Sequence, residues 1–151
     1  MKVYLACSFE YGNTTLTNER KLAIEKVAHI LMSKGMDVFI PHKCKIPNAY
    51  DYPADEWSLM VFTNDMTHIQ EADIVVLMSY GRELNNSGVC WECGFAYGIG
   101  KKVIIVKLST DCEPESLMMW HGSYAQLNGI AGLNAYDFKD LKPIRTSTTL
   151  K

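Results

Sequence analysis

The sequence has no apolar run that approaches the roughly 20 residues a membrane-spanning helix needs. It also has no excess of one charge, because 15 Lys and Arg stand against 17 Asp and Glu, for a net charge of -2. That balance argues against a nucleic-acid-binding face and against a polybasic membrane anchor. We therefore expect neither a nucleic acid nor a membrane as a partner.

Motifs for common cofactors are missing as well. There is no Gly-x-Gly-x-x-Gly and no Walker loop, so the sequence does not indicate a dinucleotide or ATP site. The one Cys-x-x-Cys, formed by Cys90 and Cys93, is a weak zinc signal because a structural site needs four ligands. The four histidines show no ligand spacing with one another. We expect no metal and no cofactor, although a redox use of the cysteine pair stays open.

The N-terminus and the cysteines give an expectation about the compartment. The stretch before Cys7 is too short and too soon polar for a signal peptide. Five cysteines, an odd number, are scattered through a chain large enough to fold without disulfides. This pattern is typical of reduced thiols, and we expect a cytoplasmic protein.

The 151 residues, of which 48% are hydrophobic and 21% charged, are expected to form a single domain spanning 1–151. Strand patterns alternate with helix patterns, and we predict strands at 2–7, 36–41, 73–79, 102–107 and 127–131. Helices are predicted at 16–34, 55–72, 88–99 and 115–120, with Gly35 and Gly100 ending two of them. Because the strands are nearly all apolar, they indicate a parallel sheet covered on both faces. Ligands of such sheets bind at the carboxyl ends of the strands.

Glu92 is the first candidate for chemistry. It follows the third predicted strand and lies in the first turns of the next helix, which places a carboxylate at the ligand edge. The helix dipole favours the ionised form, whereas burial would raise the pKa of the carboxyl. The alternative interpretation is a glutamate that only stabilises the helix N-terminus.

Asp65 and Tyr4 are the next candidates. Asp65 falls within the apolar face of its predicted helix, between Phe62 and Ile69, so it is either buried or faces a cleft. Tyr4 lies in the first strand, where its phenol can hydrogen-bond a carboxylate. The alternatives are an internal cap or ion pair for Asp65 and an ordinary core tyrosine for Tyr4.

Four segments carry a resemblance to a known family: KVYLACSF, EWSLMVFTNDMTHIQEADIVV, SGVCWECGFAYGIGKKVIIV and SLMMW. The Asn64-Asp65 pair and the Gly-x-x-Trp-Glu-x-Gly around Glu92 are its most specific parts. Over nearly its whole length the chain resembles the nucleoside 2-deoxyribosyltransferases. The resemblance implies a flavodoxin-like (Rossmann-like) three-layer α/β fold with a five-stranded parallel sheet. It also implies an enzyme of nucleotide salvage that exchanges the base of a 2′-deoxynucleoside for another free base without a cofactor.

The resemblance further implies roles for individual residues. Glu92 matches the family's nucleophile, which forms a covalent deoxyribosyl ester, and Tyr4 matches the tyrosine that holds that glutamate in place. Asp65 matches an aspartate that lines the nucleoside site. Further substrate contacts are implied for Phe9, Asn86, Gly88, Ser116 and Met118. Ser116 and Met118 reach into the site of a neighbouring subunit in the family, so we expect a homo-oligomer, either a dimer or a hexamer.

Three positions depart from the transferase pattern. Asn86 stands where the transferases have aspartate, Lys45 where they have glutamine and Ser116 where they have asparagine. The related 2′-deoxynucleoside 5′-monophosphate glycosidases tend to have serine at the last position. They also have a serine and an arginine in the first loop, where this chain has Ser8 but also Glu10. One alternative function is therefore such a hydrolase, and another is a non-catalytic nucleotide-binding domain, which the loss of a carboxylate at Asn86 permits.

Overall fold

The computed structural model describes residues 1–8, 14–80, 87–108 and 115–145 of the chain. Five strands pair in parallel in the order β2-β1-β3-β4-β5, which is the flavodoxin-like order and confirms the predicted fold class. The strands are β1 (Lys2–Cys7), β2 (Asp37–Phe39), β3 (Ile74–Ser79), β4 (Lys102–Lys107) and β5 (Ala125–Asn128).

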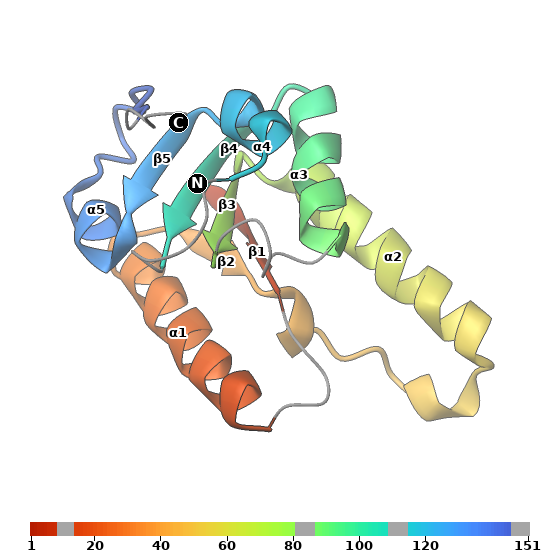
Figure 1. Ribbon diagram of the computed structural model, residues 1–151. Helices are drawn as coiled ribbons and strands as arrows, with labels where there is room; N and C mark the ends of the chain where they lie inside the picture. Colours follow the sequence, from red (N-terminus) through yellow and green to blue (C-terminus); the bar gives the residue numbers. More distant parts are fainter. Residues whose placement is uncertain (9–13, 81–86, 109–114, 146–151) are drawn as a thin grey trace.

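Helices cover both faces of this sheet, as Figure 1 shows. On one face lie α1 (Thr14–Ser33) and α5 (Gly129–Ala135). On the other lie α2 (Ala54–Glu71), α3 (Ser87–Gly98) and α4 (Leu117–Gly122). The connection from β2 to α2 contains two short 3₁₀ turns, Pro41–Lys43 and Ala49–Asp51. The result is a three-layer sandwich.

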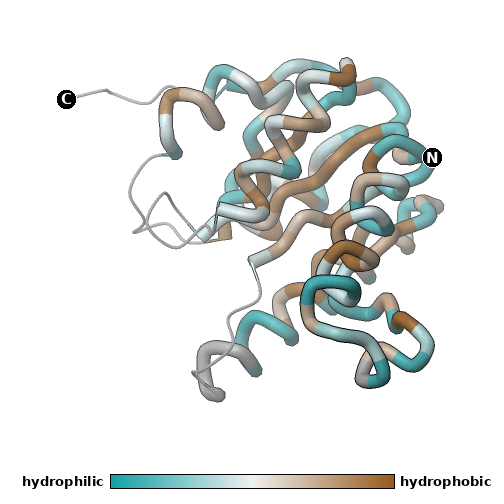
Figure 2. Tube along the Cα trace, turned by 90° about the vertical axis from the view of Figure 1, so that its right-hand side faces the viewer, coloured by the Kyte–Doolittle hydropathy of each residue, from teal (hydrophilic) through white to brown (hydrophobic). Residues whose placement is uncertain are grey.

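The pleat of the strands divides the core into two layers. In β1, Val3 and Leu5 pack toward α1, whereas Tyr4 and Ala6 pack toward α2 and α3. All six residues of β3 are buried because this central strand is covered on both faces. Figure 2 shows apolar segments in the interior of the molecule and hydrophilic segments toward its outside.

Two predicted helix ends are confirmed in detail. Gly35 follows α1 with φ 82°, and Gly100 follows α3 with φ 80°, a region that glycine adopts without strain. The Gly35 N–H donates to the Met32 carbonyl, and the Met36 N–H donates to the Leu31 carbonyl. This pair of bonds is a Schellman cap, and it satisfies carbonyls at the end of the helix.

The prediction was wrong near the C-terminus. The last strand is β5, two residues earlier than predicted, and Gly129 then begins the unpredicted helix α5. The sequence of α5, GIAGLNA, has two glycines and no charge, so it carries no amphipathic signal; packing of Leu133 in the core stabilises it instead. The predicted helix 115–120 is α4, which begins two residues later because Ser116 is its N-cap.

Leu77 gives a test of this packing, because it is fully buried in β3 directly beneath α2 and α3. We expect Leu77→Ala to lower the free energy of unfolding by about 2–5 kcal/mol, through lost burial and the cavity left behind. Urea denaturation followed by circular dichroism measures this change. The matched control is Leu22→Ala on α1, where the side chain is 72% exposed. Equal losses from the two variants would contradict the assignment of the core.

Candidate active site

A cavity of about 390 Å³ lies between α2 and α3. Its lining residues come from two turns of α2 and the first turns of α3, namely Phe62, Asp65, Met66, Ser87, Gly88, Trp91 and Glu92. The sequence predicted three of these as site residues, Asp65, Gly88 and Glu92, and the fold brings them together. Helix α3 begins just beyond the carboxyl end of β3, so the cavity opens at the predicted ligand edge.

Glu92 is held in an apolar setting that favours its protonated form. Burial raises the pKa of its carboxyl to about 7, the negative charge of Asp65 adds to the increase, and the Tyr4 hydroxyl opposes it. The Glu92 Oε2 atom is buried and has no hydrogen-bond partner in the described part of the chain. Such a carboxyl changes protonation near neutral pH, which is typical of catalytic acids, bases and nucleophiles.

Tyr4 lies below Glu92 in β1 and is 0% exposed. Its hydroxyl is buried and lies near Glu92, although it does not meet the geometry of a full hydrogen bond to any described atom. Burial raises the pKa of this phenol, and the charges of Glu92 and Asp65 raise it further. Tyr4 is therefore a buried, neutral phenol that lies beside the carboxyl of Glu92.

Asp65 is the second carboxyl of the cavity and is half-buried on α2. Burial raises its pKa, whereas the side-chain amide of Asn64 and the nearby His68 lower it. The Asn64 Nδ2 also donates to Cys44 Sγ at 3.4 Å, which links α2 to the loop after β2. Asp65 thus sits in a polar setting that differs from the apolar one around Glu92.

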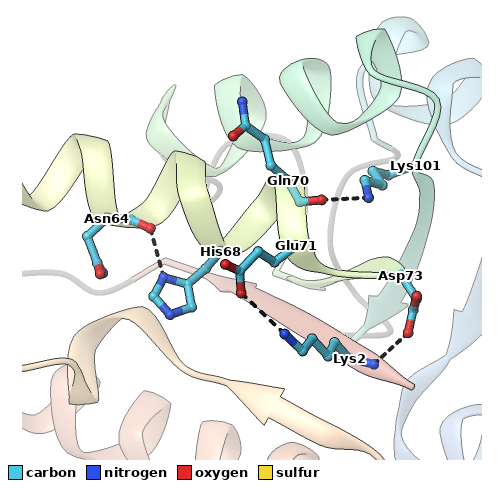
Figure 3. A network of polar contacts seen from close by, with 7 residues as sticks. All are labelled: Lys2, Asn64, His68, Gln70, Glu71, Asp73 and Lys101. Atoms are coloured by element: carbon cyan, nitrogen blue, oxygen red, sulfur yellow. Dashed lines mark hydrogen bonds and ion pairs between the residues drawn. The ribbon is translucent and has the colours of Figure 1, made fainter.

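His68 lies on α2, one turn beyond Asn64. It is half-buried, its ring stacks on Phe39 with centroids 3.6 Å apart, and Phe39 in turn stacks on Tyr4 at 5.7 Å. Its Nδ1 lies 2.8 Å from the Asn64 carbonyl oxygen, as Figure 3 shows. This stack joins the α2 side of the site to the tyrosine beneath Glu92.

Polar contacts fix the C-terminal end of α2 against the sheet. The Lys2 Nζ lies 3.3 Å from Glu71 Oε2, and the Lys101 Nζ donates to the Gln70 carbonyl at 2.7 Å. The Lys2 N–H donates to Asp73 Oδ2 at 2.7 Å, so the start of β1 is tied to the α2–β3 connection (Figure 3). The half of α2 that carries Asp65 is therefore anchored.

Aromatic rings form an apolar wall beside the two carboxyls. Phe62 lies 5.4 Å from Trp91, and Trp91 stacks on Phe95 at 5.6 Å with nearly parallel planes. The sequence indicated Trp91 as part of the motif around Glu92, but it did not indicate Phe62 as part of the site. The helical spacing of Phe62 and Asp65, three residues apart, was the available signal.

Two predicted site residues lie elsewhere in this chain. Ser116 and Met118 line a separate cavity of about 300 Å³ between α3 and α4, together with Cys90, Cys93 and His121. Met118 is 84% exposed and points away from its own core. The single chain thus does not bring these residues to Glu92. Phe9 and Asn86 lie outside the described residues, and Lys45 lines a third cavity with Cys44 and Trp57.

Cys7 is a neighbour of the site that the sequence did not single out. Burial raises the pKa of its thiol to about 12, and the charges of Glu92 and Asp65 contribute to that shift. The four cysteines of the described segments are free thiols. Within those segments no cluster of three or more His, Cys, Asp or Glu is suited to hold a metal ion. No helix among the described residues is long and apolar enough to cross a membrane.

Comparison with known proteins gives a consistent result. A family model described as nucleoside 2-deoxyribosyltransferase matches residues 3–129. The structure is similar to a 2-deoxyribosyltransferase of Bacillus psychrosaccharolyticus, with a TM-score of 0.83 and 27% identity over 97% of this chain and 100% of that one. A 2-desoxiribosyltransferase of Leishmania mexicana matches with a TM-score of 0.51 and 16% identity, over 91% and 79% of the two chains.

A CMP N-glycosidase of Clostridium botulinum matches with a TM-score of 0.48 and 22% identity, over 74% of this chain and 72% of that one. None of the curated proteins matches the chain.

The setting of Glu92 predicts opposite responses to two substitutions. Tyr4→Phe removes a hydroxyl that lowers the pKa of Glu92, so this pKa should rise, whereas Asp65→Asn removes a repelling charge and should lower it. We expect the two shifts to be opposite in sign. A ¹³C NMR titration of the Glu92 carboxyl measures both, with the exposed Glu71 as an internal control. Shifts of the same sign in both variants would contradict this arrangement.

Proposed function

The chain belongs to the nucleoside 2-deoxyribosyltransferase family, and from that premise we propose that it transfers the 2-deoxyribosyl group of a nucleoside between purine and pyrimidine bases. The observation that supports this most is the desolvated carboxyl of Glu92 at the edge of a cavity that also holds Asp65. A carboxyl with a pKa of about 7 is partly ionised at neutral pH. It can therefore act as a nucleophile without a separate base.

In the proposed first step, a carboxylate oxygen of Glu92 attacks C1′ of the deoxyribosyl group. The C1′–N bond breaks, and its electron pair leaves with the base. In the second step a nitrogen of the acceptor base attacks the same carbon and passes its proton to Asp65, the other carboxyl of the cavity. The C1′–O bond then breaks and releases Glu92 as the carboxylate. Two displacements at one carbon retain its configuration, as in retaining glycosidases. Burial lowers the cost of the first step, because Glu92 has little hydration to lose.

The departing base needs a proton. In this proposal Asp65, the other carboxyl of the cavity, supplies it. Burial raises the pKa of Asp65 above the ordinary range of an aspartate, which favours the proton-bearing form that an acid needs. The aromatic wall of Phe62 and Trp91 supports transfer over hydrolysis, because it leaves little polar surface to hold a water molecule beside the ester. Tyr4 stabilises the ionised Glu92 before attack.

The charge of the cavity supports an uncharged nucleoside as the substrate. Its described lining contains two carboxyls and no lysine or arginine, so a 5′-phosphate would be repelled there. Ser116 favours the second candidate, a 2′-deoxynucleoside 5′-monophosphate glycosidase, because the related hydrolases have serine at this position. That residue lies in the other cavity, away from Glu92 of its own chain.

Exposed apolar side chains support a homo-oligomer whose sites are shared between subunits. Large apolar side chains are exposed on three helices: Trp57, Leu59 and Phe62 on α2, Trp91 and Tyr97 on α3, and Leu117 and Met118 on α4. They belong to one layer of the fold, the layer that contains the cavity of Glu92 (Figure 1). Contiguous exposed apolar surface typically marks an interface. A second copy covering this layer would bring its Ser116 and Met118 toward a site that its neighbour leaves open.

One assay distinguishes the candidate functions. The pure protein is incubated with thymidine and adenine, and separately with single deoxynucleoside monophosphates, and the products are separated by chromatography. Deoxyadenosine in the first reaction supports the transferase. Free base with sugar phosphate in the second, without any acceptor, supports the hydrolase. Neither product together with measurable nucleotide binding would indicate a non-catalytic domain.

Removal of the proposed nucleophile tests the mechanism. Glu92→Ala should lower turnover by about 10⁴-fold or more, as deletion of a nucleophile does. The variant should still fold, because Glu92 is only half-buried and its burial disfavours the ionised form. Glu19→Ala, at an exposed glutamate of α1, is the control.

With the wild type and a deoxynucleoside but no acceptor, a mass increase of one deoxyribosyl unit should map to the peptide that contains Glu92. An adduct on Asp65, or substantial transfer by Glu92→Ala, would refute the assignment.

The interface has its own test. We expect light scattering to show a dimer or a hexamer at assay concentration, and Leu59→Glu, at the exposed apolar surface of α2, to shift it toward the monomer and to reduce activity. Leu22→Glu on α1, on the opposite layer, should leave assembly unchanged. An active wild-type monomer would contradict the shared site.

A further inference from the structure

Ser79 and Glu115 form a buried polar pair that the catalytic proposal does not use. Ser79, the last residue of β3, is 0% exposed, and Glu115 is 6% exposed. The Ser79 hydroxyl donates a hydrogen bond to Glu115 Oε1. A buried carboxyl without a hydrogen-bond partner is costly, so the hydrogen bond from Ser79 stabilises Glu115 in its buried position.

The position of Glu115 links the sheet to α4. Ser116 follows it directly and caps α4, with its Oγ accepting from the Met119 N–H at 3.3 Å and its carbonyl accepting from the Trp120 N–H at 2.9 Å. The short helix α4 then presents Met118 to solvent, whereas Met119 packs on the core beside α3. The hydrogen bond from Ser79 thus holds the residue from which α4 starts.

Glu115 also lies against α3, on the flank that carries Cys90 and Cys93. Burial is the main cause of the raised pKa of both thiols, and the charge of Glu115 adds to it, so Glu115 lies within electrostatic range of each. These two cysteines flank Glu92 in the sequence and line the cavity shared with Ser116. Glu115 therefore stands where three elements meet: the end of β3, the first turns of α3 and the start of α4.

We propose that Glu115, held by Ser79, is a positioning residue that fixes the start of α4 so that Ser116 and Met118 are presented to the active site of a second copy. This inference rests on the proposed function, in which those residues complete a neighbouring site. The hydrogen bond provides direction that apolar packing would not, because α4 is only six residues long and leaves Leu117 and Met118 exposed.

The variants isolate this hydrogen bond. Glu115→Leu keeps a similar volume but cannot accept from Ser79, and Ser79→Ala removes the donor with a smaller change. Glu115→Gln keeps an acceptor oxygen and should rescue. Glu19→Leu makes the same chemical change at an exposed position of α1 and is the control.

We expect Glu115→Leu and Ser79→Ala to raise the KM for the nucleoside by about 3- to 10-fold, the scale of one lost hydrogen bond, with kcat changed much less. Glu115→Gln should stay near the wild type. Hydrogen exchange should accelerate at the Met119 and Trp120 amides of α4 and stay unchanged in α5.

Mixed oligomers test whether the effect is exerted on the neighbour. Glu115→Leu subunits keep Glu92, and Glu92→Ala subunits keep an intact α4. With the Glu92→Ala subunit in excess, nearly every working Glu92 is served by an intact α4 from its neighbour. The KM of the mixture should therefore return to the wild-type value.

A mixture that keeps the raised KM overturns the proposal, since Glu115 would then act on its own subunit. Wild-type KM and wild-type exchange in both Glu115→Leu and Ser79→Ala overturn it as well. If Glu115→Leu does not fold, Ser79→Ala provides the same two readouts. A wild-type protein without transfer activity would refute the proposed function instead, and exchange at the α4 amides would still decide whether the Ser79–Glu115 pair fixes that helix.

Discussion

The desolvation of Glu92 is the constraint on which the site depends. In the unfolded chain this carboxyl titrates in its ordinary range, whereas burial raises its pKa to about 7 in the folded protein. Between these two values the folded state binds the extra proton, so its stability decreases as the pH rises through that window. The nearby Tyr4 hydroxyl opposes this increase in the pKa of Glu92 and so favours the ionised carboxylate. A more solvated carboxyl would be better for stability and poorer as a nucleophile.

Much of the fold could be predicted because its central strands are unambiguous. β1 and β4 lie at their predicted bounds and β3 begins one residue later, since each is an apolar run whose two faces are both covered. Helix α5 could not be predicted, because the packing of Leu133 stabilises it and no periodic pattern encodes it. The spacing of apolar residues predicts a helix only when that helix is amphipathic.

The same distinction separates the site residues that could be predicted from the sequence from those that could not. Asp65 and Glu92 were identified because each is a carboxyl in an apolar stretch, and the parallel topology then brings α2 and α3 to one edge. Phe39 and Cys7 were not identified, because they approach the site through strand pairing and look like core residues in the sequence. The position of Ser116 relative to a neighbour depends on a second chain, which no pattern within one chain describes.

The Cys-x-x-Cys motif illustrates how burial changes an interpretation. Reactive cysteines need an accessible thiolate. Here Cys93 is buried in the apolar layer with Tyr4, and burial raises the pKa of both its thiol and that of Cys90. The pair therefore contributes packing beside the helix turn that carries Glu92, and the redox interpretation left open by the sequence is disfavoured.

Helix α2 extends beyond the sheet, as Figure 1 shows. Its inner half buries Ile69 and is anchored to β1, whereas Trp57 and Leu59 of its outer half lie exposed. A helix of a few turns without packing is marginal in water. Association would supply the missing contacts, so folding of the outer half of α2 would be coupled to assembly by mass action. The melting temperature would then depend on protein concentration, and dilution would fray the outer half of α2 while the half that carries Asp65 stays anchored to β1.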